Sequence, residues 1–241
     1  MSAIKTSDLS KKYGDLTAVD KLNLSIDKGE LFALLGLNGA GKTTAIKMLS
    51  CLIRPSSGDA VLLGDSVIDD PQAVKQKVNV SPQETAVAPN LSVSENLALM
   101  AGIYGQDSET ATRGTREMSS RFGLDGVLGK KAKTLSGGMQ RRLSIAMALI
   151  SKPQILFLDE PTLGLDVLAR RELWAAIESL KGEVTIVLTT HYLEEAEALC
   201  DRVGVMAKGR LIAVGTAEEL MKMTNTGNLE DAFVALSGGA L

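Results

Sequence analysis

A glycine-rich run between an apolar segment and a helical one constrains the fold of this chain more than any other feature. Residues 36–43 read GLNGAGKT and fit the pattern G-x-x-x-x-G-K-[ST]. The continuous apolar segment 31–35 predicts a fully buried strand before the run, and residues 45–52 have helical character after it. Glycines allow successive backbone N–H groups to face an anion, and the following helix directs its positive end to the same place. The run therefore predicts a loop that binds phosphate.

Side chains of this loop have candidate roles in holding a nucleotide. Lys42 supplies a point charge for the β- and γ-phosphates, and the hydroxyl of Thr43 can bind Mg²⁺. The predicted nucleotide-binding residues of the loop are Gly36, Leu37, Asn38, Gly39, Ala40, Gly41, Lys42, Thr43 and Thr44. A fortuitous glycine-rich turn is the alternative, but the flanking strand and helix are those that such a loop requires. By itself the loop indicates a P-loop NTPase, a class that includes kinases, GTPases and transport motors.

Two acidic residues follow a second buried strand. Residues 155–158 form a short apolar run that ends in Asp159 and Glu160, directly before Pro161. Because ligands of open α/β sheets bind at the carboxyl ends of the strands, both acids are candidates for the same site. Asp159 would hold Mg²⁺, while Glu160, one residue later, could polarise an attacking water. Alone, the pair could be ordinary strand-end acids; together with the loop it predicts nucleotide hydrolysis.

Strand and helix patterns alternate along most of the chain. Residues 22–26 alternate apolar and polar side chains and predict a half-buried strand. A helical pattern covers residues 173–180 and a strand pattern covers 184–188, while the segments 202–206 and 211–214 flank a Lys-Gly turn and predict a hairpin. Strands that alternate with helices indicate an α/β fold with a parallel sheet covered on both faces.

A helical stretch interrupts this alternation. Between about residues 86 and 150 the strand signal fades and helical patterns dominate, with 94–104 and 141–150 the best of them. The region 102–133 is visibly more polar than the rest of the chain. We expect a helical lobe inserted into the α/β core, which makes the core discontinuous in sequence.

Composition and charge argue against several classes of protein. The formal net charge of -3 speaks against nucleic acid as the main partner, although it leaves room for a local basic patch. No stretch approaches the about 18 consecutive apolar residues of a membrane-spanning helix, and residues 1–10 lack the apolar centre of a secretory signal. Cys51 and Cys200 form no metal-binding or redox pattern. We expect a soluble cytosolic protein with reduced cysteines.

Residues 135–140 read LSGGMQ and precede a helix that is expected to begin near Arg141. At this point the sequence resembles the ABC ATPase family, whose signature is LSGGQ. The other parts of the family's pattern occur in the family's order along nearly the whole chain. They are Tyr13 as the adenine-stacking aromatic, Gln83 as the Q-loop glutamine, 93–97 as a helical-lobe segment, 163–166 as the D-loop, and His191 as the switch histidine. Each could be a structural residue when taken singly, but their common order makes coincidence negligible.

Two positions depart from the common family pattern. Leu37 replaces a proline, which matters little because glycines set the backbone there, and Met139 replaces the glutamine of the signature. The resulting SGGM resembles a variant frequent in ATP-binding subunits of ABC-2-type exporters. The segment 228–233, NLEDAF, also resembles the tail of that subgroup.

The resemblance implies the architecture of the chain. We expect an α/β fold with a P-loop NTPase (RecA-like) core, an inserted α-helical lobe and an N-terminal antiparallel β-subdomain. The whole of residues 1–241 would be a single ABC ATPase domain. Its core would take residues 1–85 and 151–225, its helical lobe about 86–150, and a short C-terminal tail 226–241.

The resemblance also implies a site shared by two ATPase units packed head to tail. Each bound ATP, with its Mg²⁺, would lie between the loop of one unit and the signature of the other, so that ATP joins the units and hydrolysis releases them. Glu160 would act as the base, and His191 would contact the γ-phosphate and water. The implied roles are catalytic for Glu160, His191 and Gln83; nucleotide-binding for Tyr13, Ser136, Gly137, Gly138 and Asp166; and metal-binding for Thr43, Gln83 and Asp159.

The partners implied are an integral membrane permease on a separate chain and a second ATPase subunit, in the simplest case a homodimer, at the cytoplasmic side of the cell membrane. No nucleic acid partner is expected.

An alternative is a non-transport ABC ATPase that acts on another macromolecule, as in DNA repair or on the ribosome. The chain lacks the heptad array and the second ATPase unit of such relatives. A non-catalytic nucleotide-binding module is a further class, against which Glu160 and His191 speak. GTP in place of ATP is a further possibility, but the sequence contains no Asn-Lys-x-Asp motif, which reads the guanine base.

Overall fold

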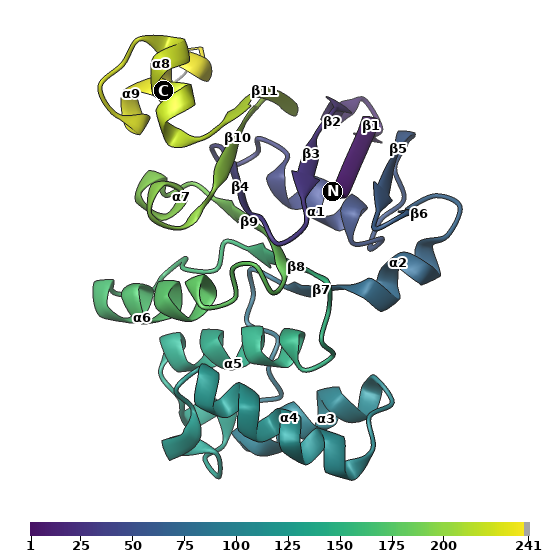
Figure 1. Cartoon of the computed structure of the whole chain (residues 1–241), viewed down its shortest axis with the longest axis vertical. Coiled ribbons are helices and arrows are strands. Elements are labelled where there is room, and N and C mark those ends of the chain that lie inside the picture. The colour runs from purple at the N-terminus through teal and green to yellow at the C-terminus, as the bar shows by residue number, and fades with distance from the viewer. Residues whose placement is uncertain (239–241) are drawn as a thin grey trace.

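Two β-sheets and a set of helices build the structure, a computed structural model that describes residues 1–238 (Figure 1). The first sheet is antiparallel, has the order β2-β1-β5-β6, and pairs β3 with β1. Its strands are β1 (Ser2–Tyr13), β2 (Leu16–Leu22), β3 (Ser25–Asp27), β5 (Ser57–Leu62) and β6 (Asp65–Ser66). The second sheet has the order β11-β10-β4-β9-β8-β7. Its strands are β4 (Leu31–Leu35), β7 (Val78–Ser81), β8 (Ile155–Asp159), β9 (Thr185–Thr190), β10 (Arg202–Ala207) and β11 (Arg210–Gly215).

The second sheet is parallel except at its β11 edge. β10, β4, β9, β8 and β7 pair in parallel, and only β10 and β11 form an antiparallel hairpin. In this register Leu35 pairs with Thr190, and Asp159 pairs with Thr189. The carboxyl ends of β4, β8 and β9 therefore meet at one edge of the sheet, where the glycine-rich run begins.

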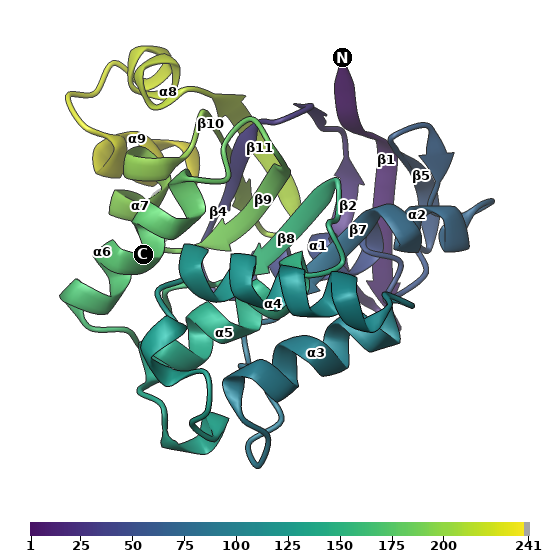
Figure 2. The same cartoon turned by 60° about the horizontal axis from the view of Figure 1, so that its bottom comes forward.

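Helices surround this sheet, and three of them form a lobe below it in Figure 1. The lobe consists of α3 (Val93–Ile103), α4 (Ser108–Arg121) and α5 (Gly137–Leu149), together with the short 3₁₀ turns η1 (Asp125–Val127) and η2 (Ala132–Thr134). In Figure 1 α5 lies between the sheet and the other two helices of the lobe, and Figure 2 shows the lobe turned toward the viewer. The remaining helices are α1 (Lys42–Leu49), α2 (Pro71–Lys77), α6 (Val167–Glu178), α7 (Leu193–Leu199), α8 (Ala217–Thr224) and α9 (Leu229–Leu236). None of the helices in residues 1–238 has the length and apolar character needed to cross a bilayer.

The parallel sheet separates two hydrophobic cores, because side chains of a strand alternate between its faces. On β4, Leu31, Ala33 and Leu35 join the core shared with the lobe, α6 and α7. Phe32 and Leu34 join the core shared with α1 and the antiparallel sheet. β8 divides its residues in the same way. Every residue of β4 and β8 is buried, which explains the continuous apolar runs in the sequence.

The fold expected from the sequence is confirmed, with corrections at several helix ends. The helix expected over 45–52 spans 42–49, and the helix expected to begin near Arg141 begins at Gly137. α5 starts early because Ser136 caps it, its hydroxyl accepting a hydrogen bond from the backbone N–H of Met139 at 3.3 Å. The expected tail 226–241 contains α9, and its last three residues lie outside the described part.

A buried carboxyl joins α6 to α7. Glu195 is fully buried, and its Oε1 accepts a hydrogen bond from Trp174 Nε1 at 3.1 Å. Its Oε2 has no hydrogen-bond partner among residues 1–238. Burial raises the pKa of Glu195, since the charged form loses its hydration, although nearby hydrogen-bond donors offset part of this rise.

This raised pKa predicts a pH-dependent effect of Glu195→Gln. The native state holds the Glu195 proton to higher pH than the unfolded state does. The stability that this proton gives the parent is therefore lost as the pH rises from 4.5, the ordinary pKa of a glutamate, through the raised pKa of the native state. The glutamine variant keeps an acceptor for Trp174 and has no such titration. Its melting temperature relative to the parent should therefore rise in thermal unfolding experiments as the pH is raised above 4.5.

The matched control is Glu194→Gln, because Glu194 is the adjacent residue and its side chain is 83% exposed. Its difference from the parent should hardly change with pH. Equal pH profiles for the two variants would contradict a raised pKa of Glu195 in the native state.

Candidate functional site

The glycine-rich loop connects β4 to α1 and depends on two glycines for its course. Gly41 has φ 102°, and a Cβ on it would lie 2.5 Å from the carbonyl oxygen of Ala18. A Cβ on Gly36 would lie 2.5 Å from the carbonyl oxygen of Met206. The loop is thus pressed between the antiparallel sheet and β10, and only glycine fits at these two positions.

Lys42 and Glu160 form a buried ion pair at the base of this loop. Their side chains are 6% and 7% exposed, and Lys42 Nζ lies 3.2 Å from Glu160 Oε1. The same ammonium donates hydrogen bonds to the carbonyl oxygens of Gly36 at 2.7 Å and Leu37 at 3.3 Å. His191 Nδ1 lies 2.8 Å from the other carboxylate oxygen of Glu160. The sequence-predicted loop lysine, strand-end acid and histidine therefore form one connected group.

Asp159 gathers a second group of oxygen atoms beside the first. Its Oδ1 accepts hydrogen bonds from Thr43 Oγ1 at 3.1 Å and from Thr189 Oγ1 at 2.6 Å. Asp159 is 5% exposed, so this carboxylate is held in a low-dielectric setting at the strand end. A carboxylate with a neighbouring hydroxyl is an all-oxygen donor set, the kind that hard cations such as Mg²⁺ prefer.

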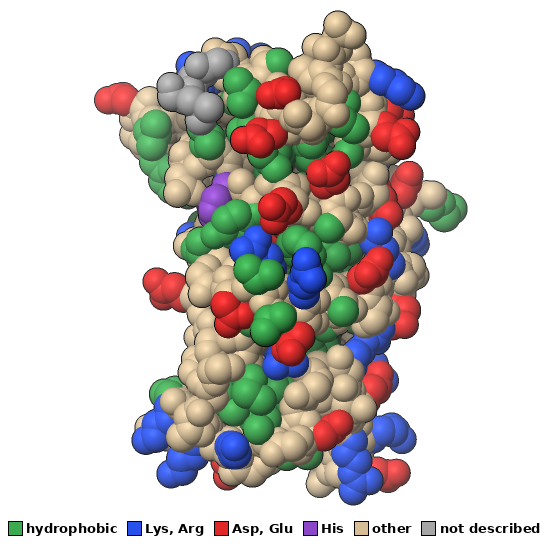
Figure 3. All heavy atoms as spheres, turned by 90° about the vertical axis from the view of Figure 1, so that its left-hand side faces the viewer, with side chains coloured by type: hydrophobic (Ala, Val, Ile, Leu, Met, Phe, Trp, Pro, Cys, Tyr) green, Lys and Arg blue, Asp and Glu red, His purple; other side chains and the backbone are tan. Residues whose placement is uncertain are grey.

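An open cavity of about 700 Å³, here called the loop cavity, brings most of the predicted residues together. Its lining consists of Tyr13, Leu16, Thr17, Ala18, Asn38, Gly39, Ala40, Gly41, Lys42, Thr43, Thr44, Gln83, Glu160, Leu163, His191, Lys208 and Gly209. Tyr13 is 48% exposed at its rim. In Figure 3 the one histidine of the chain reaches the molecular surface.

Several lining residues escaped the sequence analysis. Leu16, Thr17 and Ala18 come from the start of β2, while Lys208 and Gly209 form the β10–β11 turn. This turn is tied to the loop because Gly209 N–H donates to the carbonyl oxygen of Ala40 at 3.1 Å. No motif marks these residues, and only the pairing of distant strands reveals them.

The predicted signature residues and Asp166 of the D-loop lie outside the lining of this cavity, whereas Leu163 of the D-loop belongs to it. Ser136 and Gly137 are exposed at the N-terminus of α5. Asp166 is exposed at the N-terminus of α6, where its Oδ1 accepts a hydrogen bond from Ala169 N–H at 2.9 Å. The two helix starts are close, since a Cβ on Gly138 would lie 2.8 Å from Ala169 Cβ.

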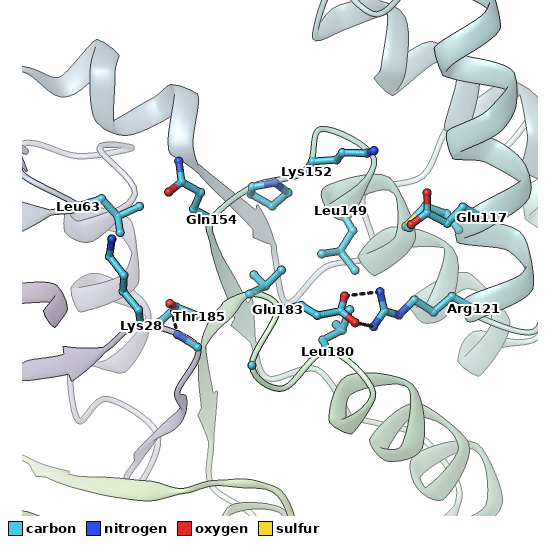
Figure 4. A pocket seen from close by; sticks show the side chains of 15 residues that line it. Lys28, Leu63, Glu117, Arg121, Leu149, Lys152, Gln154, Leu180, Glu183 and Thr185 are labelled. Carbon is cyan, nitrogen blue, oxygen red and sulfur yellow. Dashed lines mark hydrogen bonds and ion pairs between the residues drawn. The ribbon is translucent and has the colours of Figure 1, made fainter. Parts of the chain in front are cut away.

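A second cavity, of about 530 Å³, lies at the amino ends of the parallel strands (Figure 4). It is lined partly by the lobe, through Glu117 and Arg121 of α4, and partly by the core, through Lys28 and Lys152. Arg121 pairs with Glu183 there, with N–O distances of 2.8 and 3.1 Å. It shares no lining residue with the loop cavity, so it is remote from the predicted chemistry.

The strand–loop–helix unit, with its lysine and its strand-end carboxylate, defines a P-loop nucleotide-binding protein. Residues 19–163 match the family described as "ABC transporter". The chain therefore belongs to the ABC transporter family, and its fold is that of the family's ATP-binding domain.

Relatives with curated names agree with this assignment. The chain is 42% identical over 90% of its length to the daunorubicin/doxorubicin resistance ATP-binding protein DrrA of Streptomyces peucetius. It is 39% identical over 98% of its length to the probable multidrug ABC transporter ATP-binding protein YbhF of Escherichia coli. The chain spans 66% of the first relative and 42% of the second.

A solved structure described as a dimeric, post-hydrolysis state of the ATP-binding cassette MJ0796 bound to ADP and Pi is similar in fold. It is 26% identical, has a TM-score of 0.79, and the match covers 88% of this chain and 98% of that one.

The close approach of α5 and α6 predicts opposite outcomes for two adjacent alanine substitutions. Gly138→Ala places a methyl group against Ala169 and should lower the free energy of unfolding by about 1–3 kcal/mol through overpacking. Gly137→Ala meets nothing within 4 Å and should raise it by up to about 1 kcal/mol, because alanine favours helix. Urea unfolding of both variants measures this. Equal effects of the two changes would contradict the packing account.

Proposed function

We propose that this chain is the ATP-hydrolysing subunit of an ABC exporter and that two copies bind two ATP molecules between them. We treat residues 1–241 as one ATPase domain, with its core in 1–85 and 151–225, its lobe in about 86–150 and its tail in 226–241. The observation that carries the proposal is the split arrangement of the site. Lys42, Glu160 and His191 line the loop cavity, whereas Ser136 and Gly137 lie outside its lining and are exposed on the surface.

A second copy can supply what one chain lacks. The hydroxyl of Ser136 and the N–H groups of Gly137 and Gly138 form the start of α5, where the helix dipole favours an anion. Next to Asp166, the side chains of Val167 and Leu168 are 61% and 74% exposed, an apolar surface suited to a subunit interface. The dimeric state of the MJ0796 cassette, which is bound to ADP and Pi, supports a dimer of ATPase subunits.

The polar contacts suggest how the site changes when ATP enters. Lys42 Nζ is shared between loop carbonyl groups and Glu160, and the phosphates would compete for it. Drawing the ammonium away would free Glu160 Oε1 to accept a proton from the attacking water, while His191 holds Oε2. Tyr13 at the rim would stack on the base of the nucleotide.

Thr43, Asp159 and Gln83 would hold Mg²⁺ beside the phosphates, because the first two already share a hydrogen bond and the third lines the same cavity. A metal held there would supply positive charge, which offsets the negative charge that develops during phosphoryl transfer. Asp166, which caps α6, would connect the two sites of the dimer.

Both named relatives are ATP-binding proteins of drug resistance or multidrug transport, which supports an exporter. We accordingly propose a separate membrane permease as the partner and the cytoplasmic face of the membrane as the place of work. The transported substrate would be selected by that permease.

The variant Glu160→Gln tests the ATPase proposal. It should bind ATP, lose turnover by about 100-fold or more because the base is removed, and accumulate an ATP-dependent dimer. Phosphate release and light scattering after gel filtration measure these effects. Lys42→Ala is the matched control: it removes the charge that meets the phosphates, so it should bind ATP weakly and form no such dimer. Parent-like turnover in Glu160→Gln, or unchanged ATP affinity in Lys42→Ala, would overturn these roles.

Purification of the tagged chain from solubilised membranes tests the partner. We expect an integral membrane protein with several spanning helices to copurify in stoichiometric amount, and ATP turnover of the chain to change when the two are recombined. Copurification of only a ribosome or a nucleic acid complex would instead favour the non-transport alternative.

A further inference from the structure

Arg141 is a buried cation that no carboxylate contacts. It is 3% exposed in the first half of α5, and it takes part in no ion pair among residues 1–238. Burial lowers the pKa of its guanidinium, and the charges of Asp159 and Glu195 oppose that effect. An apolar side chain of similar length would fill the same space without the cost of dehydrating a charge, so packing alone does not account for it.

All hydrogen bonds of this guanidinium go to backbone carbonyl oxygens. Nη1 donates to Pro82 at 2.6 Å, and Nη2 donates to Gln83 at 2.7 Å and to Glu160 at 3.1 Å. Pro82 and Gln83 follow β7, whereas Glu160 follows β8. One planar side chain from the lobe thus holds the ends of two neighbouring strands of the core.

The adjacent residue shows that this arrangement is specific to position 141. Arg142 forms an ordinary ion pair, with Nη2 at 3.2 Å from Glu172 Oε2 on α6. Successive residues of a helix point in different directions, so of these two arginines it is Arg141 that faces the strand ends.

The carbonyl group that Arg141 holds belongs to a strained residue. Glu160 has φ 49°, a left-handed conformation that costs a side-chain-bearing residue about 1–2 kcal/mol. Its N–H donates to Thr189 O at 3.1 Å and to Thr189 Oγ1 at 3.0 Å, and its carbonyl oxygen also accepts from Leu163 N–H at 3.2 Å. Strained backbone persists only where the surroundings fix it on both sides. Within residues 1–238, Arg141 supplies the one side-chain hydrogen bond to this carbonyl oxygen.

We propose that Arg141 is a positioning residue that fixes the Glu160 carboxylate by holding its backbone, and so makes that carboxylate depend on the placement of α5. The inference rests on the proposed role of Glu160 as the base. α5 begins at the signature residues. A movement of the lobe toward or away from the core would therefore shift the Glu160 carboxylate, the group that would activate water.

The test uses Arg141→Met, which removes the donors but keeps the length, and Arg141→Lys, which keeps the charge without the fork. We expect kcat to fall about 100-fold in the first, the cost of a small misplacement of a catalytic group, and about 10-fold in the second. KM and Kd for ATP should stay within about threefold, because the hydrogen bonds that Arg141 makes within residues 1–238 go to Pro82, Gln83 and Glu160 and not to Lys42 or its loop. Arg116→Met, the same change at an exposed position of the lobe, is the control and should leave kcat unchanged.

A double-mutant cycle separates positioning from general loss of structure. If Arg141 acts through Glu160, Arg141→Met should cause little further loss of the residual turnover of Glu160→Gln. Parent-like kcat in Arg141→Met, or the same fold loss in both backgrounds, overturns the proposal. If Arg141→Met fails to fold, Arg141→Lys carries the same cycle.

Hydrogen exchange without nucleotide gives a readout independent of turnover. In Arg141→Met the backbone amide of Leu163 should exchange faster, because its acceptor is the carbonyl oxygen of Glu160, while amides of α9 should not change. Unchanged protection of Leu163 would also overturn the proposal. A parent without ATP turnover would contradict the proposed function, and this exchange experiment would still decide the role of Arg141.

Discussion

Parallel pairing of β4, β9 and β8 is the constraint on which the whole site depends. The register sets Leu35 beside Thr190 and Asp159 beside Thr189, so the three strands end at the same level. Each strand then delivers a different group: β4 leads into the glycine-rich loop, β8 supplies Asp159 and Glu160, and β9 leads to His191. A shift of one residue in either pairing would turn the side chains of the shifted strand to the opposite face of the sheet.

Because these strands end at one place, opposite charges are paired within the site. Lys42 and Glu160 are both buried, and each offsets the charge of the other at 3.2 Å. Removing one partner would leave an uncompensated buried charge, which is costly. Under the proposed function the pair would also be exchangeable, because a phosphate group would replace the carboxylate as the partner of Lys42. The buried charges of the site are therefore paired before any anion binds.

The sequence was most informative where a local pattern had a single physical meaning. Continuous apolar runs predicted β4 and β8, since strands buried on both faces admit few polar residues. Helix α4 was not predicted, because its sequence SETATRGTREMSSR is polar and buries only Gly114, Thr115, Met118 and Ser119. The sequence also placed Arg141 only as the start of a helix; its burial depends on backbone carbonyl groups that lie more than fifty positions away, on Pro82 and Gln83, and no local pattern records them.

The lobe is attached to the core in two physically different ways. Along α5 apolar packing accompanies the hydrogen bonds of Arg141, because Leu143, Ala146 and Leu149 belong to the same hydrophobic core as Leu156 and Leu158 of β8. At the far end of α4 Arg121 forms an ion pair with Glu183, whose carboxylate is 60% exposed, and also donates hydrogen bonds to Ser179. Exposed ion pairs contribute at most about 1 kcal/mol and weaken as salt is added, whereas apolar contacts do not. Added salt should therefore weaken the ion pair between α4 and the core, while the apolar packing of α5 against the core is unaffected.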